Sequence, residues 1–367
     1  MTTGQERVSP LNVHGYEESA RAVLPLMVFD YIRGGSGDEA TLRANQSAFD
    51  QWRLLPRVLR GHAATSTETT VLGQTVSLPL LVAPVGFHRL VHDEGELATA
   101  RAARGAGTIY TCSTAATFSI EEIAPHAGPW WFQLYVFQDR SITVDLVQRA
   151  AAAGASAIVV TVDTPVLGRR EADETNHFAL PGGLGWANLA GTTHQDMRAT
   201  AGSGLTAYTT TSFDRTLTWR DIEWLATVSD LPLIIKGVLA ADDAREAFDR
   251  GVRAVVVSNH GGRQLDGAVA SLDALPAVAE AAAGRGEVLM DGGVRRGTDV
   301  LKALALGARA VLLGRPVLWA LATGGEAAVL ELLNLLGSEL ARDMALCGCA
   351  TTNDVTASLV VRRGPVG

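Results

Sequence analysis

The sequence is poor in cysteine, in positive charge and in long apolar runs. Only three of its 367 residues are cysteines (Cys112, Cys347 and Cys349), too few for a disulfide framework or a four-ligand structural zinc site. Asp and Glu outnumber Lys and Arg by 39 to 31, and the net charge of −8 argues against nucleic acid as the main partner. No run of about 18 uncharged apolar residues occurs, which argues against a membrane-spanning helix.

The N-terminus also lacks a targeting signal. Its first ten residues, MTTGQERVSP, contain no apolar stretch of the kind that a secretory signal needs. We expect the few cysteines to be reduced thiols, and these features together predict a cytoplasmic protein without a membrane partner. His88 and His92 are four residues apart, as two metal ligands on a helix can be, but no third ligand is evident and we predict no metal site.

The composition suits a large folded core. Hydrophobic residues make up 47% of the chain and charged residues 19%, and the length fits one large or two medium domains. Eight short apolar runs recur along the chain, and most are continuously apolar, as strands buried on both faces are. The runs are Leu78–Ala83, Thr108–Cys112, Trp130–Tyr135, Ala157–Val162, Leu231–Lys236, Ala254–Val257, Val288–Met290 and Ala310–Leu313.

Helix-like segments that end in glycine separate these runs, and glycine is a common helix terminator. Four of them are Glu94–Gly105, Ile142–Gly154, Ala241–Gly251 and Thr298–Gly307. Strand–helix alternation repeated eight times predicts an α/β fold, a (β/α)₈ TIM barrel, with an open doubly wound sheet as the alternative. We expect one domain over residues 1–367.

Two segments lie outside this alternation. Residues 1–77 precede the first strand, and Tyr16–Gly34 has a helical pattern, so we predict an N-terminal helical cap packed on the barrel. Residues 178–218 form a long loop after strand four that is rich in Gly, Thr and Ser. Barrel enzymes place active-site lids at such positions, although a surface loop without a role fits the sequence equally well.

Polar residues follow the predicted strands at their carboxyl ends, where barrels of this type carry their chemistry. Asp291, Gly293 and Arg295 follow strand seven, and Gly314 and Arg315 follow strand eight. The glycines let backbone N–H groups approach an anion, and the arginines supply positive charge. These two loops therefore predict a phosphate site.

A second group of strand-end residues suits acid–base chemistry on a carboxylic acid. A histidine such as His260 can act as a base near neutral pH, and a neighbouring carboxylate would fix its tautomer. Two arginines can clamp a carboxylate, and a lysine beside a flavin ring can stabilise negative charge on it. The group consists of Tyr31, Tyr135, Asp163, Arg170, Lys236, His260 and Arg263.

Six motifs resemble those of the FMN-dependent (S)-2-hydroxy-acid oxidizing family, which includes glycolate oxidase, lactate oxidase, mandelate dehydrogenase and 4-hydroxymandelate oxidase. They are SNHGGRQLDG, DGGVRRGTDVLKALALGA, TVDTPVLGRRE, FQLYV, IIKGV and GRP, in an order that spans roughly Tyr31 to Trp319. The resemblance implies an FMN cofactor, the oxidation of a 2-hydroxy acid to a 2-keto acid, and a homo-oligomer, commonly a tetramer.

The resemblance also implies a role for each matching residue. His260 would be the active-site base, Asp163 would pair with it, and Tyr135 would lie near the substrate hydroxyl. The substrate carboxylate would be held by Tyr31, Arg170 and Arg263. The FMN-binding residues would be Pro84, Val85, Gly86, Ser113, Gln133, Thr161, Lys236, Ser258, Asp291, Gly293, Arg295, Gly314 and Arg315.

Two positions depart from the glycolate oxidase pattern. Ala115 stands where glycolate oxidases carry a tryptophan, which favours a wider pocket and a larger or aromatic substrate unless Phe87 or Phe118 refills the space. Gly86 stands where many oxidases of the family have alanine, whereas mandelate dehydrogenase and lactate monooxygenase resemble this sequence in having glycine. The acceptor of the electrons is therefore open between oxygen, a quinone and another carrier.

We expect an oxidase of (S)-2-hydroxy acids that favours mandelate-like or other bulky substrates and passes electrons to O2, giving hydrogen peroxide. The alternatives are a dehydrogenase with another acceptor and a lactate- or glycolate-type oxidase or monooxygenase. A more remote alternative is an FMN-dependent isomerase without net redox change, which would not need His260, Arg170 and Arg263. A flavin-binding protein without catalytic activity would not be reduced by any hydroxy acid.

Overall fold

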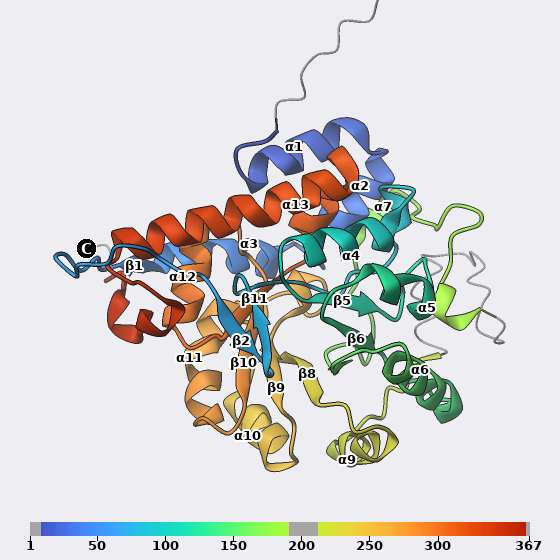
Figure 1. The fold of residues 1–367 in the computed structure, drawn as a ribbon. Helices are drawn as coiled ribbons and strands as arrows, with labels where there is room; N and C mark the ends of the chain where they lie inside the picture. Colours follow the sequence, from blue (N-terminus) through green and yellow to red (C-terminus); the bar gives the residue numbers. More distant parts are fainter. Residues whose placement is uncertain (1–8, 191–211, 365–367) are drawn as a thin grey trace, which may run out of the picture.

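A closed barrel of eight parallel strands forms the centre of the molecule in the computed structural model, which describes residues 9–190 and 212–364 (Figure 1). Neighbouring strands pair in chain order, and the last pairs with the first. The strands are β4 (Leu80–Val82), β5 (Tyr110–Ser113), β6 (Trp130–Leu134), β7 (Ile158–Thr161), β8 (Leu233–Val238), β9 (Ala254–Val257), β10 (Glu287–Asp291) and β11 (Ala310–Leu313). The predicted (β/α)₈ barrel is confirmed, and the alternative of an open sheet is wrong.

Helices surround the barrel (Figure 1). They are α4 (Gly95–Gly105), α5 (Ile120–Ile123), α6 (Arg140–Ala152), α7 (Glu171–Thr175), α9 (Trp219–Val228), α10 (Ala241–Asp249), α11 (Ser271–Ala282), α12 (Gly297–Ala305) and α13 (Arg315–Leu346). Short 3₁₀ helices lie between them: η2 (His88–Leu90), η3 (Ala124–His126), η4 (Ala187–Leu189) and η5 (His260–Gly262). The four helices predicted before a glycine match α4, α6, α10 and α12 to within about two residues at each end, the ordinary uncertainty of a helix boundary.

Helix α13 is the longest helix, with 32 residues and a kink at Gly324 and Gly325. By length and composition alone it is apolar enough to cross a membrane. The sequence analysis did not identify this helix as a candidate, because Glu326 and Glu331 interrupt its run of apolar residues. In the structure, 61% of its most apolar window is buried, and the helix packs against α4, α12 and the N-terminal cap. Burial of this kind is typical of a core helix.

The N-terminal cap contains three helices, α1 (Val13–Val23), α2 (Leu26–Arg33) and α3 (Ala40–Ser47), followed by η1 (Ala48–Gln51). The segment Tyr16–Gly34, predicted to be helical, contains parts of two helices, because Pro25 separates α1 from α2. Proline has no N–H for a helical hydrogen bond and disfavours helical backbone in the residue before it. Helix α1 lies along α13, as Figure 1 shows, so the cap is joined to the outer ring of helices.

The cap also contains short strands, although the sequence predicted only helices there. Strand β1 (Trp52–Leu54) pairs antiparallel with β12 (Val360–Arg362), which joins the N-terminal cap to the C-terminal segment of the chain. Strands β2 (Thr69–Val71) and β3 (Gln74–Val76) form a hairpin. Two 3₁₀ helices, η6 (Thr352–Asp354) and η7 (Ala357–Leu359), precede β12.

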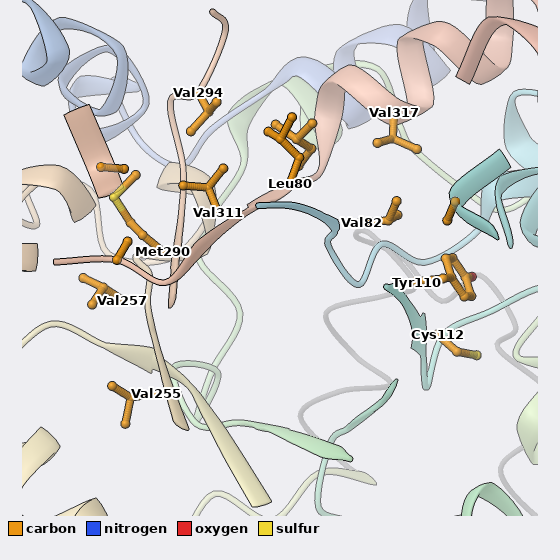
Figure 2. Packing of buried hydrophobic residues seen from close by; sticks show 14 of the residues in the cluster. Leu80, Val82, Tyr110, Cys112, Val255, Val257, Met290, Val294, Val311 and Val317 are labelled. Carbon is orange, nitrogen blue, oxygen red and sulfur yellow. The ribbon is translucent and has the colours of Figure 1, made fainter. Parts of the chain in front are cut away.

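Side chains of the barrel strands alternate between two hydrophobic cores, because successive residues of a strand point to opposite faces. The outward-facing residues pack under the helices, and Figure 2 shows Leu80, Val82, Val255, Val257 and Val311 among them. The inward-facing residues fill the barrel itself and include Leu81, Trp131, Val159, Ile234 and Leu289, all 0% exposed. Val71 and Val76 of the β2–β3 hairpin belong to this inner core. Each fully buried aliphatic side chain stabilises the fold by about 1.5–3 kcal/mol before entropy is counted.

The three cysteines are buried and unpaired. The two histidines that are four residues apart do not share an α-helix, since His88 begins η2 and His92 follows it. The Nδ1 atom of His88 lies 3.0 Å from the hydroxyl of Thr99. Across residues 9–190 and 212–364, no cluster of three His, Cys, Asp or Glu side chains is arranged to hold a metal ion.

Candidate active site

A large cavity opens at the carboxyl ends of the barrel strands, and most of the predicted site residues line it. The space between its walls amounts to about 1,220 Å³, part of which is open to solvent. The predicted residues on its wall are Tyr31, Pro84, Val85, Gly86, Ser113, Tyr135, Arg170, Lys236, His260, Arg263, Asp291, Gly293, Arg295, Gly314 and Arg315. The other four, Gln133, Thr161, Asp163 and Ser258, lie behind the wall and bond to residues on it or to one another.

Six inward-facing polar residues close the top of the inner core, and we call them the polar belt: Ser113, Gln133, Thr161, Lys236, Ser258 and Asp291. The Ser113 hydroxyl donates to Gln133 Oε1 (3.1 Å), and Gln133 Nε2 donates to the Thr161 hydroxyl (3.0 Å). Lys236 Nζ lies 3.1 Å from both the Ser258 hydroxyl and Asp291 Oδ2. The belt is thus a hydrogen-bonded floor beneath the cavity.

The two charged residues of the belt, Lys236 and Asp291, form an ion pair. Burial acts against the ammonium of Lys236, but the carboxylates of Asp291 and Asp163 outweigh it, and the pKa of Lys236 lies above its ordinary value. The second oxygen of Asp291 is buried and has no hydrogen-bond partner within the described ranges. A buried acceptor of this kind suits a hydroxyl-bearing ligand, because an unsatisfied buried oxygen is costly.

His260 and Asp163 form a hydrogen-bonded pair at the edge of the belt. His260 Nδ1 lies 2.9 Å from Asp163 Oδ1, and since a carboxylate only accepts, the ring donates its proton from Nδ1. Burial lowers the pKa of His260, and the charge of Lys236 acts in the same direction against the opposing effect of Asp163. The imidazole is therefore neutral near neutral pH, and its Nε2 is free to accept a proton.

The backbone around His260 adopts a tight turn. His260, Gly261 and Gly262 have φ values of +58°, +64° and +74°, the left-handed region that favours glycine. A Cβ at Gly262 would lie 2.6 Å from the backbone nitrogen of Leu42, so only glycine fits there. The Ser258 hydroxyl accepts a hydrogen bond from the backbone N–H of His260 (3.0 Å) and helps to hold the turn.

Gln264 is a site residue that sequence reasoning missed. Its Nε2 donates to the carbonyl oxygens of Asp163 (2.7 Å) and Val166 (2.8 Å), and its Oε1 accepts from Gly168 N (3.0 Å). The side chain therefore ties the loop after β7 to the loop that carries His260. Gln264 stands within the SNHGGRQLDG motif, but nothing in the sequence distinguishes it from an exposed polar residue.

Partly buried arginines also line the cavity. Arg263 Nη1 donates to the carbonyls of Tyr31 (2.7 Å) and Gly34 (3.0 Å), and Arg315 donates to those of Ile32, Gly34 and Gly261. Both guanidinium groups therefore meet the carbonyl-rich end of α2, where positive charge is favourable.

These arginines have too few carboxylate partners for their burial. Arg170 pairs with Asp173 at 3.3 Å, but Arg263, Arg295 and Arg315 form no ion pair with any residue in the described ranges. Burial and the neighbouring charge of Arg170 lower the pKa of Arg263 to about 10, and burial lowers the pKa of Arg315 well below its ordinary value. Because an unpaired buried charge is costly, the cluster is suited to anions.

Aromatic rings form part of the cavity wall, and two of them were not predicted. Phe87 packs edge-on against Trp186 (centroids 6.0 Å apart), and Phe213 stacks on Tyr135 at 4.5 Å. Trp186 and Phe213 belong to the predicted lid over residues 178–218, where their aromatic character in a polar loop was an available signal. Residues 191–211 of that segment lie outside the described residues.

The two departures from the glycolate oxidase pattern lie against each other. A Cβ at Gly86 would lie 2.8 Å from the Cβ of Ala115, so the two small residues are in direct contact on the cavity wall. Of the two aromatic residues considered as replacements, Phe87 lines the cavity. Phe118 is not among the lining residues, and its ring lies 5.2 Å from the guanidinium of Arg89.

Comparison with known proteins identifies the family. The sequence model described as FMN-dependent dehydrogenase matches residues 20–362. This chain belongs to the FMN-dependent dehydrogenase family. It is 51% identical to the L-lactate oxidase of Nostoc sp. over 96% of this chain and 98% of the relative. It is 47% identical to 2-hydroxyacid oxidase 1 of Homo sapiens over 96% of this chain and 97% of the relative.

The solved structures agree with this placement. The crystal structure of mandelate oxidase with (S)-4-hydroxymandelic acid superposes with a TM-score of 0.91 at 47% identity, covering 94% of this chain and 97% of that chain. The predicted family, the FMN cofactor and an oxidoreductase activity on 2-hydroxy acids are thereby confirmed.

The cavity fits FMN by its own chemistry. Arg295 and Arg315 are partly buried cations without a carboxylate partner in the described ranges, as a phosphate site requires. The unpartnered oxygen of Asp291 suits a ribityl hydroxyl. Gly292 and Gly293 have φ values of +96° and +82°, so their backbone adopts a turn that few other residues can form.

Proposed function

We propose that this member of the FMN-dependent dehydrogenase family oxidises an (S)-2-hydroxy acid with a mandelate-like or similarly bulky side chain to the 2-keto acid, with O2 as acceptor. In the overall reaction the acid loses two electrons and two protons, and O2 gains them to become hydrogen peroxide. One observation carries the proposal: the His260–Asp163 pair, the unpaired arginines and the aromatic wall share one cavity.

When bound, FMN supplies the two-electron acceptor that no side chain can provide. Arg295 and Arg315 would hold its phosphate, Asp291 its ribityl chain, and Lys236 the electron-rich edge of its ring. The remaining residues proposed for the FMN site are Pro84, Val85, Gly86, Ser113, Gly293 and Gly314 on the cavity wall, with Gln133, Thr161 and Ser258 in the hydrogen-bonded floor that supports it.

The substrate carboxylate would be held by Arg170 and Arg263, with Tyr31 assisting. Among the described residues Arg263 donates only from Nη1, which leaves Nη2 and Nε for a ligand. The guanidinium of Arg263 also lies 5.1 Å from the ring of Tyr31, which fixes its plane. A carboxylate held there by a bidentate pair is oriented as well as bound.

His260 would then take up a proton that the alcohol loses, at Nε2. Asp163 holds the ring by Nδ1 and stabilises the positive charge that the imidazole acquires. Burial raises the pKa of Tyr135 well above its ordinary value, so this hydroxyl stays protonated and can donate a hydrogen bond to the substrate oxygen. The aromatic rings of Phe87, Tyr135, Trp186 and Phe213 line the same cavity and would limit the access of water to a bound substrate.

Contact between Gly86 and Ala115 supports the bulky substrate, since the wall carries no large side chain at either position. The similarity to mandelate oxidase points the same way, although the similar L-lactate oxidase of Nostoc sp. acts, by its name, on a smaller acid. Gly86 also favours a second candidate, a dehydrogenase that passes its electrons to a carrier other than O2.

The test is reduction of the purified holoenzyme without oxygen by (S)-mandelate, (S)-lactate and glycolate, followed by readmission of air. We expect mandelate to bleach the flavin fastest and air to restore the colour with formation of hydrogen peroxide. Restoration only by an added dye or quinone would show a dehydrogenase. A flavin that no 2-hydroxy acid bleaches would contradict the proposed activity.

A matched pair of variants tests the pocket. In Ala115→Trp the indole must enter the cavity, and we expect kcat/KM for mandelate to fall about tenfold or more while that for glycolate is retained, because pocket size discriminates by roughly 1–3 kcal/mol. Phe118→Ala, outside the cavity wall, should change neither value. Equal losses for both acids in Ala115→Trp would argue against the bulky substrate.

A further inference from the structure

A buried pair of side-chain amides joins the N-terminal cap to the loop that carries His260. Asn45 lies in α3 and is 1% exposed, and Asn259 directly precedes His260 and is 4% exposed. Each amide donates from Nδ2 to the Oδ1 of the other, at 2.8 Å in both directions. The two residues are 214 positions apart in the chain, and neither lines the cavity.

The rest of the pair's hydrogen bonds fix both ends of the loop. Asn259 Oδ1 accepts from Gly262 N (3.0 Å), and Asn259 Nδ2 donates to Val269 O (3.0 Å). Asn45 Oδ1 accepts from Ser271 N (3.2 Å), where α11 begins. Buried amides destabilise a fold unless they are bonded, and a fully bonded network favours one arrangement over others. The turn at His260 is therefore held from outside the barrel.

Asn45 also lies against the loop after β10. A Cβ at Gly293 would be 1.9 Å from the carbonyl oxygen of Asn45, and one at Gly292 would be 3.3 Å from Asn45 Nδ2. These glycines stand between Asp291 and Arg295, the residues proposed to hold the ribityl chain and phosphate. The same residue of α3 thus contacts the base loop and the flavin loop.

We infer that Asn45 is a positioning residue that sets the place of His260 through Asn259 and the place of the Asp291–Arg295 loop by direct packing. The inference rests on the proposed roles of these residues and deepens them. The distance and orientation between His260 and the bound flavin would then be fixed, because the loops that hold them both contact Asn45 of the cap. The cap is in this sense part of the active site, although of its described residues Tyr31 and Ile32 alone reach the cavity wall.

The test compares Asn45→Ala with Asn12→Ala, a matched loss of a side-chain amide from the same cap. Asn12 accepts from Gly15 N at the start of α1, and among the described residues no hydrogen bond ties its side chain to either loop. In Asn45→Ala we expect anaerobic flavin reduction to slow by about tenfold to a hundredfold, the cost of a small misplacement of reacting groups. We expect its affinity for FMN, from titration of the apoprotein followed by flavin fluorescence, to fall about tenfold, because the amide that packs against Gly292 is lost and the Asp291–Arg295 loop is held less firmly.

Asn12→Ala should leave both quantities near the wild type while lowering the melting temperature. Asn259→Ala should slow reduction as Asn45→Ala does, and the double variant should be no slower than either, because the two amides act as one unit. Should Asn45→Ala fail to fold, Asn45→Asp keeps the acceptor for Ser271 N and loses the donor to Asn259, with the same expected direction.

Unchanged reduction and FMN affinity in a folded Asn45 variant, or additive effects of the two alanine variants, would overturn the inference. Failure of the proposed function looks different. In that case the wild-type holoenzyme itself would not be reduced by any 2-hydroxy acid, while the FMN titration would still decide whether Asn45 anchors the flavin loop.

Discussion

The two halves of the barrel interior differ in chemistry although the same eight strands build both. Toward the amino ends the inward-facing side chains are almost all apolar and fully buried, and the β2–β3 hairpin packs against them. Toward the carboxyl ends the inward-facing positions become the polar belt. The change takes two residues along a strand, from Ile234 to Lys236 and, on β10, from Leu289 to Asp291.

This difference separates what holds the barrel together from what it does. Apolar burial in the lower half stabilises the fold without reference to a ligand. The upper half contains charges that are tolerated because Lys236 pairs with Asp291 and His260 with Asp163, and because the arginines face a cavity built for anions. Substitutions in the two halves should therefore affect different measurements.

The largest expected effect is on catalysis, from the upper half. His260→Gln removes the proton acceptor, and we expect flavin reduction by the substrate to slow by about 10²–10⁴-fold, the usual contribution of a positioned base. FMN affinity and the melting temperature should stay near those of the wild type. Stopped-flow reduction without oxygen gives the rate, and a variant within tenfold of the wild type would show that His260 is not the base.

In the lower half we expect the reverse. Leu289→Ala leaves a cavity beneath the belt and should cost about 2–5 kcal/mol of unfolding free energy. Urea unfolding of the holoenzyme, followed by tryptophan fluorescence, measures this loss. At a temperature where the variant is folded, its kcat/KM should match the wild type. A parallel loss of kcat/KM would mean that the two halves are not independent.

The fold could be predicted from the sequence because its signal is repeated. Eight apolar runs alternate with helical segments, and each repetition strengthens the inference of a parallel barrel. The cap offered no repeat. One proline, Pro25, decides that two helices replace one, and strand β1 depends on a partner about 300 residues away that local pattern does not indicate.

The candidate site divides in the same way. Residues directly after strands, such as His260 and Arg295, could be predicted because the barrel brings all strand ends to one face. Trp186 and Phe213 could not, since their place depends on the path of a long loop. Asn45 and Gln264 act through bonds to other elements, and an asparagine or glutamine in a sequence gives no sign of its partner.

A smaller effect is expected when a hydroxyl is removed from an inward-facing position, and two such positions allow the upper and lower halves of the barrel to be compared. Ser258 accepts from both Lys236 Nζ and His260 N, so Ser258→Ala should cost about 1–3 kcal/mol, as for buried donors left unsatisfied, and slow flavin reduction. Thr111 lies lower in the barrel, and its hydroxyl has no partner within the described residues.

Thr111→Val should therefore be neutral or stabilising and leave the rate unchanged, since it removes a polar group that gains nothing from burial. Thermal unfolding and anaerobic reduction of both variants provide the comparison. A destabilised Thr111→Val would show that polar groups are needed throughout the barrel and not only in its upper half.

The smallest effect concerns pH. Burial, helped by Lys236, lowers the pKa of His260 below its ordinary value of 6.5, and the reaction needs the neutral ring. Flavin reduction should therefore be independent of this group above pH 6.5 and slow as the pH falls through the lowered pKa. The free energy of unfolding should also decrease as the pH falls below 6.5. The histidine of the unfolded chain has the higher pKa and binds a proton before that of the folded protein, which favours the unfolded state.

Asp163→Asn should lower the pKa of His260 further. The carboxylate raises the pKa of His260, so its loss should move the falling limb of the rate profile to still lower pH and reduce the plateau. Anaerobic reduction across the acid range measures both. A limb above pH 6.5 in the wild type would mean that Asp163, rather than burial, dominates the charge of the upper half. The pair would then act as a preformed imidazolium, unsuited to the role of base.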